Sequence, residues 1–155
     1  MNIPKKKMEV RLERMIPASP SAVFDGWLDP KVPGNPWNMG DKLILNPKVD
    51  GFFYWLVHDT PHYGRFTQVK RPARIQHTWM SPYTSGLEST VTVTFKRKGA
   101  ETLMTLVHSG LPDTEGGKSH ERGWNFFLDS YPKHFARAAG KNRPLRRAKL
   151  VTEPS

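Results

Sequence analysis

The sequence contains no cysteine among its 155 residues. This absence excludes disulfide bonds and metal sites built on thiolates. The sequence also lacks any apolar run that approaches the roughly 18 to 20 residues a membrane-spanning helix needs. Its basic start, Met1–Lys7, is followed by alternating polar residues, whereas a signal peptide would continue with an apolar segment. We therefore expect a soluble cytoplasmic protein.

The motifs of common enzyme classes are missing as well. The sequence has no HExxH or HxH spacing, no nucleophile elbow, no phosphate loop and no glycine fingerprint for dinucleotides. His58 and His62 straddle an expected turn, but their spacing is not that of a metal-ligand motif. We therefore expect neither a metal ion nor another cofactor.

The net charge of +10 is concentrated at the two ends of the chain. Lys5–Lys7 contribute three positive charges, and the six basic residues from Arg137 to Lys149 outnumber Glu153 by five, which leaves about two for residues 8–136. Such ends attract polyanions, but the expected strands carry no basic and aromatic stripe of the RNA-binding type. We interpret the ends as solvated termini and expect no nucleic-acid partner, with polyanion binding as the alternative.

Alternation and proline positions predict the first elements of the chain. Residues 8–16 alternate between apolar and polar, which is typical of a half-buried strand. Ser19 and Pro20 then supply an N-cap and a first-turn proline for a short helix with apolar residues four apart. Prolines between residues 30 and 36 end this helix. We expect a second short helix or an irregular turn around Trp37.

The middle of the chain, from residue 42 to residue 109, alternates apolar segments with turn residues. The connections are too short for the crossovers that parallel strands require. An antiparallel meander is therefore predicted. Its five or six strands are expected at residues 42–46, 51–58, 62–70, 74–80, 88–98 and 101–109.

After Gly116 and Gly117 the apolar residues recur every three and four positions, which predicts a long helix. Pro132 lies inside this stripe and has no N–H, so it should kink or locally open the helix. We expect a single domain over residues 1–140 and a flexible basic tail over residues 141–155. The stripe consists of His120, Trp124, Phe127, Leu128, Tyr131 and Phe135.

Four segments of the chain resemble the SRPBCC superfamily, and within it the branch of activator of Hsp90 ATPase homologues. They are IPASPSAVFDGWLDP, GFFYW, ETLMTLVHSGLPD and HERGWNFFLDSY, in this order. The resemblance implies an α+β, helix-grip (START-like) fold, in which a curved antiparallel sheet wraps around a long C-terminal helix and leaves an apolar cavity between them. It also implies several activities: binding of small apolar or aromatic molecules, sequestration of toxic natural products, cyclase chemistry, or a chaperone-linked role in stress.

The turn at Gly99-Ala100 decides which face of the following strand lies inward. The strand before it alternates inward apolar residues, ending at Phe95, with threonines. A two-residue turn would place Phe95, Val93 and Val91 opposite Met104, Leu106 and His108. A three-residue turn would bring Leu103, Thr105 and Val107 inward. We favour the two-residue turn, and the family resemblance favours Phe53 and Trp55 as the inward pair of their strand.

The residues expected around the cavity come from four strands and the long helix. A predominantly apolar pocket with few polar groups is typical of a small-molecule site. We expect it to bind a small apolar or aromatic molecule in a monomer or homodimer, and the alternative is an ordinary filled core. The expected residues are Phe53, Trp55, Ile75, His77, Trp79, Val91, Val93, Phe95, Met104, Leu106, His108, Trp124, Phe127, Leu128 and Tyr131.

His77 and His108 are the polar members of this set that could act on a ligand. A histidine can orient a carbonyl or a phenol, or accept a proton near neutral pH. The second hypothesis is therefore a cyclase- or hydrolase-type enzyme in which one of them acts with Tyr131 or Tyr83. A third hypothesis is interaction with a chaperone or a polyanion through the basic ends.

Overall fold

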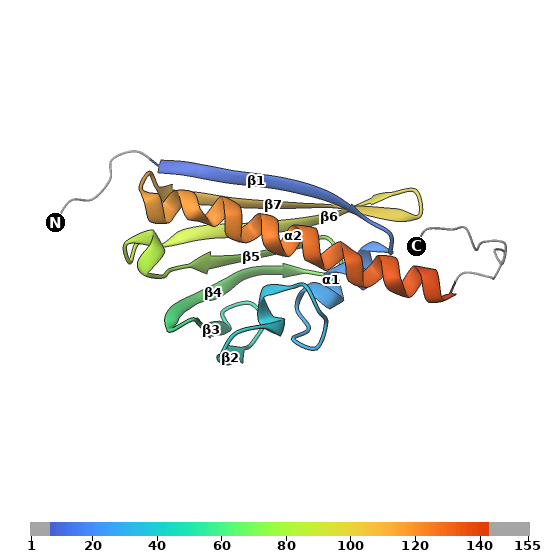
Figure 1. Ribbon diagram of the computed structural model, residues 1–155, viewed down its shortest axis with the longest axis horizontal. Coiled ribbons are helices and arrows are strands. Elements are labelled where there is room, and N and C mark those ends of the chain that lie inside the picture. Colours follow the sequence, from blue (N-terminus) through green and yellow to red (C-terminus); the bar gives the residue numbers. More distant parts are fainter. Residues whose placement is uncertain (1–6, 143–155) are drawn as a thin grey trace.

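The computed structural model describes residues 7–142 of the chain. Within this range strands outnumber helices, and one long helix closes the fold (Figure 1). The elements are β1 (Lys7–Ile16), α1 (Pro20–Trp27), the 3-10 helix η1 (Pro36–Asn38), β2 (Lys42–Leu45), β3 (Phe52–Val57), β4 (Thr60–Lys70), β5 (Arg74–Trp79), the 3-10 helix η2 (Pro82–Thr84), β6 (Ser89–Lys98), β7 (Glu101–Pro112) and α2 (Glu115–Asn142).

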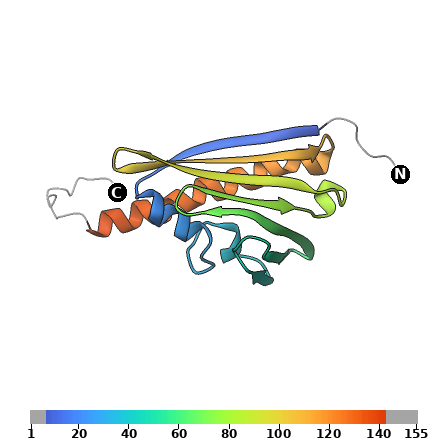
Figure 2. The same cartoon turned by 180° about the vertical axis from the view of Figure 1, so that it is seen from behind.

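The described strands form one curved antiparallel sheet with the order β1-β7-β6-β5-β4-β3-β2. β2 to β7 follow one another as a meander, and β1 joins the free edge of β7. The helix α2 crosses one face of this sheet, and Figure 2, from the other side, shows the sheet in front of the helix. The α+β, helix-grip fold expected from the sequence is confirmed.

The β6–β7 hairpin has the two-residue turn that the sequence favoured. Phe95 lies opposite Met104, and Val91 lies opposite His108. Gly99 occupies the left-handed region with a φ of 63°, which a glycine adopts without steric cost. Since this register fixes the parity of β7, it directs Met104, Leu106 and His108 into the core, where all three are fully buried.

The buried side-chain amide of Asn35 holds the loop after α1 against that helix by hydrogen bonds. The side-chain nitrogen of Asn35 donates to the carbonyl oxygens of Gly26 and Asp29 at 2.7 and 2.9 Å. Its side-chain oxygen accepts from the backbone N–H of Asn38 at 3.0 Å, which caps η1. These bonds fix the segment that packs under the C-terminal half of α2.

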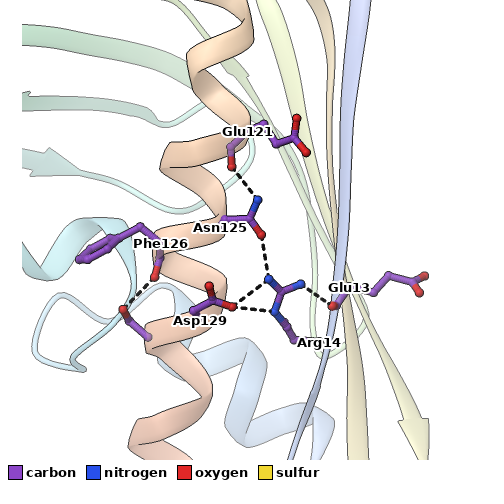
Figure 3. A network of polar contacts seen from close by, with 7 residues as sticks. Glu13, Arg14, Glu121, Asn125, Phe126 and Asp129 are labelled. Carbon is purple, nitrogen blue, oxygen red and sulfur yellow. Dashed lines mark hydrogen bonds and ion pairs between the residues drawn. The ribbon is translucent and has the colours of Figure 1, made fainter.

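Arg14 on β1 ties the edge of the sheet to α2 (Figure 3). Its guanidinium donates to the Asp129 carboxylate at 2.8 and 3.1 Å, to the Asn125 side-chain oxygen at 2.8 Å and to the backbone oxygen of Glu13 at 2.8 Å. All five N–H donors of a guanidinium lie in one plane. The hydrogen bonds of Arg14 to two residues of α2 therefore fix the position of the helix along β1 and its rotation about its own axis.

Most element boundaries agree with the prediction to within one residue, and the larger differences concern β4, β7 and η2. The turn between β3 and β4 consists of His58 and Asp59, both left-handed with φ of 50° and 61°, so β4 begins at Thr60 and includes Pro61. β7 runs three residues further than predicted, to Pro112. The 3-10 helix η2 was expected only as a turn, although Ser81, Pro82 and Thr84 supply its capping box and first-turn proline.

The helix α2 continues past Pro132 to Asn142 as one element. Residues 1–6 and 143–155, which hold most of the basic ends, lie outside the described residues. None of the described helices has the length and apolar character required to cross a membrane.

Candidate functional site

A pocket opens between the N-terminal half of α2 and the strands β3, β4 and β5, beside η2. Its volume is about 170 Å³. Its walls are aromatic and imidazole rings, with only small side chains between them. The lining residues are Trp55, His62, Trp79, Tyr83, Ser119, His120, Gly123, Trp124 and Phe127.

All fifteen residues that the sequence assigned to the cavity are buried. Only four of them line the pocket: Trp55, Trp79, Trp124 and Phe127. The other eleven lie in the packed core. The interior between sheet and helix is thus mostly filled by side chains, and this pocket lies at one end of it.

Three tryptophans form the apolar wall of the pocket. The ring centroids of Trp79 lie 6.0 Å from Trp55 and 5.2 Å from Trp124. The indole nitrogen of Trp55 donates to the backbone oxygen of Met39 at 2.8 Å. The indole nitrogen of Trp79 is buried and has no partner among the described residues. Packed against one another, the three indole rings present rigid, flat faces to the pocket.

His108 lies behind this wall, and its hydrogen bonds determine its tautomer. The Trp124 indole N–H donates to Nδ1 of His108 at 2.9 Å, so Nδ1 carries no proton. Nε2 therefore carries the proton and donates to the Ser89 hydroxyl at 2.7 Å, and that hydroxyl donates to the backbone oxygen of Trp79 at 2.7 Å. Burial holds the pKa of His108 well below its ordinary value. Because both ring nitrogens are engaged, His108 holds the Trp124 indole in place, contacts the Trp79 backbone through Ser89, and has no nitrogen left for a ligand.

His62 and His120 are different, because each lines the pocket directly. Nδ1 of His120 lies 3.0 Å from the Gly116 carbonyl oxygen and 3.1 Å from that of Gly117. Nδ1 of His62 lies 3.3 Å from the Trp55 carbonyl oxygen. A carbonyl only accepts, so Nδ1 carries the proton in each ring. Burial lowers the pKa of both histidines, which favours their neutral forms.

Of the other groups considered for catalysis, Tyr83 lines this pocket, whereas His77 and Tyr131 do not. Nδ1 of His77 donates to the Thr78 carbonyl oxygen at 2.9 Å, and complete burial among aromatic rings lowers its pKa to about 4. The Tyr131 hydroxyl donates to the Val23 carbonyl oxygen at 2.6 Å, and burial raises its pKa. Both bonds serve the fold, and neither group is positioned to act on a molecule in the pocket.

Gly123 leaves the mouth of the pocket open. A Cβ atom at this position would meet nothing within 4 Å. Packing therefore does not require a glycine here, although a glycine inside a helix costs about 1 kcal/mol relative to alanine. At Gly116 and Gly117, by contrast, a Cβ atom would collide with the backbone of Tyr83 and of Pro112.

Five lining residues were absent from the predicted set: His62, Tyr83, Ser119, His120 and Gly123. Two of these residues, His62 and His120, could have been predicted from their positions in the sequence. Treating His58-Asp59 as a two-residue turn places His62 opposite Trp55, as the structure does. His120 precedes Trp124 by four residues and so shares its helix face. Among residues 7–142, no group of three or more histidine, aspartate or glutamate side chains could hold a metal ion.

Comparison with known proteins identifies relatives of this fold. The sequence model of the family described as "Activator of Hsp90 ATPase homolog 1-like protein" matches residues 17–136. No curated protein matches the sequence. A solved structure from Mesorhizobium loti has a TM-score of 0.73 at 20% identity, over 84% of this chain and 98% of that one.

Two further solved structures are informative through their descriptions. One, from Plasmodium falciparum, is described as an HSP90 activator and has a TM-score of 0.66 at 22% identity, over 86% of this chain and 96% of that one. The other, described as an Aha1 dimer from Colwellia psychrerythraea, has a TM-score of 0.64 at 12% identity, over 78% of this chain and 90% of that one. At such identities these structures establish a shared fold.

Proposed function

The chain belongs to the family of activator of Hsp90 ATPase homolog 1-like proteins, within the SRPBCC superfamily, and from this premise we propose that it binds a small aromatic molecule in the pocket beside Gly123. The observation that carries the proposal is the open space itself, surrounded by three tryptophans and a phenylalanine in an interior that is otherwise filled. A concavity lined by aromatic side chains is typical of a small-molecule site.

The size of the pocket supports a ligand of one aromatic ring. An apolar protein cavity of about 150 Å³ holds one benzene molecule, and this pocket measures about 170 Å³. The flat indole faces of Trp55, Trp79 and Trp124 suit a planar guest, since aromatic pairs prefer offset or edge-to-face contact. A large polycyclic molecule would have to displace the wall or extend out through the mouth.

Gly123 makes the proposal testable by filling the mouth. In Gly123→Leu the new side chain would enter the open space above the pocket. The affinity of this variant for anisole, a neutral one-ring probe, should therefore be at least about tenfold lower than that of the wild type. Binding would be followed by isothermal titration calorimetry. Arg122→Leu is the matched control, because it adds the same side chain to the neighbouring position, which does not line the pocket, and it should bind anisole like the wild type.

Two results would contradict the proposal. If the wild-type protein binds neither anisole nor its isomer para-cresol up to their solubility limits, the pocket is not a site for one-ring ligands. If Gly123→Leu and Arg122→Leu bind anisole equally well, the ligand occupies another place. Circular dichroism of both variants shows whether they keep the fold.

A second candidate function is contact with an Hsp90-type chaperone, as in the Plasmodium falciparum protein described above. The observation in its favour is an exposed row on the outer face of the sheet. Ile44 lies opposite Tyr54 on β3, and Tyr54 lies opposite Tyr63 on β4. Ile44 and Tyr63 remain exposed, at 56% and 42%. Exposed apolar rows of this kind mark interaction surfaces in many proteins.

This second candidate predicts that the protein stimulates the ATPase activity of a purified Hsp90 and that Ile44→Lys abolishes the stimulation. Thr92→Lys, on the outer face of β6, is the control and should retain it. If the two variants stimulate the Hsp90 ATPase equally, the row of Ile44, Tyr54 and Tyr63 is not the contact surface.

A further inference from the structure

We infer that the ligand is a neutral hydrogen-bond donor of the phenol type, whose hydroxyl donates to Nε2 of His120. This inference rests on the proposed function, because it specifies the ligand class of the same pocket. It follows from which polar groups the wall offers and which of them the fold already uses.

The first step is the tautomer of His120. Two backbone carbonyl oxygens, of Gly116 and Gly117, lie at hydrogen-bond distance from its Nδ1. They hold the proton on Nδ1, and the neutral ring then carries a lone pair on Nε2. The helix supplies this arrangement locally, since both carbonyls lie three and four residues before His120 in the same helix. The ring therefore presents an acceptor and no donor from its second nitrogen.

The second step is the state of the other wall groups. The indole N–H groups of Trp55 and Trp124 donate to protein acceptors within the fold. The indole nitrogen of Trp79 has no partner among the described residues, but it is buried and does not open onto the pocket. The Ser119 hydroxyl donates to the Gly116 carbonyl oxygen at 2.6 Å, which leaves its oxygen as a further acceptor. His62, like His120, holds its Nδ1 proton on a backbone carbonyl. Apart from the Tyr83 hydroxyl, which can donate or accept, the polar groups that face the pocket thus offer lone pairs.

The third step is charge. The lining residues include no lysine, arginine, aspartate or glutamate. A buried carboxylate ligand would meet no cation and would face the lone pairs of neutral imidazoles, and burial of an unpaired charge is strongly unfavourable. A neutral guest that donates one hydrogen bond satisfies the wall, whereas a purely apolar guest leaves the acceptor without a partner.

The isomers para-cresol and anisole separate these cases. They have the same atoms and nearly the same size, but only para-cresol has a donor. By isothermal titration calorimetry the wild-type protein should bind para-cresol about fivefold more tightly than anisole, and benzoate not measurably. In His120→Phe, which keeps a ring but removes the acceptor, the preference should disappear or reverse. In His120→Gln, which restores an acceptor near the position of Nε2, it should return.

The outcomes distinguish this inference from the proposed function. If the wild-type protein binds both isomers equally, the inference is wrong and the proposed function stands. If para-cresol is preferred and His120→Phe keeps that preference, His120 is not the acceptor and the inference is also wrong. If neither isomer binds, the proposed function itself fails. The wild-type comparison needs no variant, so it remains decisive even where a substitution impairs folding.

Discussion

The two halves of α2 pack in different ways against the rest of the fold. Near its C-terminal half, Gly34 approaches the helix so closely that a Cβ atom there would lie 2.5 Å from Cα of Tyr131. Near its N-terminal half, a Cβ atom on Gly123 would meet nothing within 4 Å. At Gly34 a glycine is needed, because the backbone of α2 occupies the place that a side chain would take. At Gly123 there is room for a side chain.

This difference assigns separate tasks to the two halves of one helix. The C-terminal half is the anchor, where Tyr131 packs edge-on against Trp27 at 5.1 Å and donates to the backbone of α1. The N-terminal half is the roof of the pocket. Native interiors tolerate few voids, because each void reduces the stability of the fold. Close packing at the anchor offsets the stability that the opening at the other end costs.

The largest expected effect is at the anchor. Gly34 has a φ of 98°, and a side chain there would also collide with the backbone of α2. Gly34→Ala should therefore lower the free energy of unfolding by about 4 kcal/mol or more. Urea denaturation followed by tryptophan fluorescence measures it. A loss below about 1 kcal/mol would show that the anchor is no tighter than the roof.

Acid should destabilise the fold next most strongly. Burial lowers the pKa of His77 to about 4, whereas an unfolded histidine titrates near 6.5. Between these values the unfolded chain binds more protons, so stability falls as the pH falls from 6.5 toward 4. His77 alone should account for on the order of 3 kcal/mol. His62 and His120, whose pKa values are also lowered, act in the same direction.

Urea denaturation at pH 7 and at pH 4.5 measures this dependence. His77→Gln serves as the control, because it lacks the titrating ring and should lose less stability between the two pH values, whatever its stability at pH 7. Of the two histidines of the pocket wall, His120 is part of the roof and His62 lies on β4 across the pocket, so hydrogen exchange at pH 5 should rise there before it rises around Tyr131. Equal pH dependence of His77→Gln and the wild type would contradict the account.

A smaller effect is expected at the guanidinium that joins β1 to the helix. Arg14 is partly buried and makes a two-point contact with Asp129. Arg14→Met should cost about 1 to 2 kcal/mol. Arg11→Met is the matched control, since Arg11 lies on the same strand and its contact with Glu13 is longer, at 3.7 Å, and exposed. Thermal denaturation of the two variants should differ, and equal melting temperatures would exclude a role for Arg14 in holding the helix.

The smallest effect has the opposite sign. Gly123→Ala should stabilise the protein by about 1 kcal/mol, because it improves helix propensity and its methyl group enters open space. Its melting temperature is compared with that of the wild type. Destabilisation would mean that the space beside Gly123 is closed in solution, which would remove the contrast between roof and anchor.

The sequence predicted the architecture and the register of the β6–β7 hairpin, because these depend on the two-residue alternation of strands, on the 3.6-residue repeat of helices and on the length of one turn. The inward positions of β6 and the two-residue turn at Gly99 were sufficient to place Leu106 and His108 in the core. Alternation reports the face of a sheet on which a side chain lies. It carries no information on whether the neighbours of that side chain fill the space beside it.

For this reason the fifteen residues that the sequence named are all buried, but the sequence could not separate pocket from core. Phe95 and Trp79 follow the same alternation, but Phe95 packs against Phe24 at 5.4 Å, whereas Trp79 borders open space. The position of α1 decides this difference, because it fills one end of the interior and leaves the other open. That position depends on the amide of Asn35 and on close backbone contacts, which no periodic pattern reports.

The most direct test of the central claim follows the five indole N–H signals of the protein by NMR during a titration with para-cresol. Trp55, Trp79 and Trp124 line the pocket, whereas Trp27 and Trp37 lie in the packed part of the core. The account predicts saturable shifts of the first three signals that are clearly larger than those of the other two. Shifts of all five signals to the same extent, or of Trp27 and Trp37 alone, would contradict it.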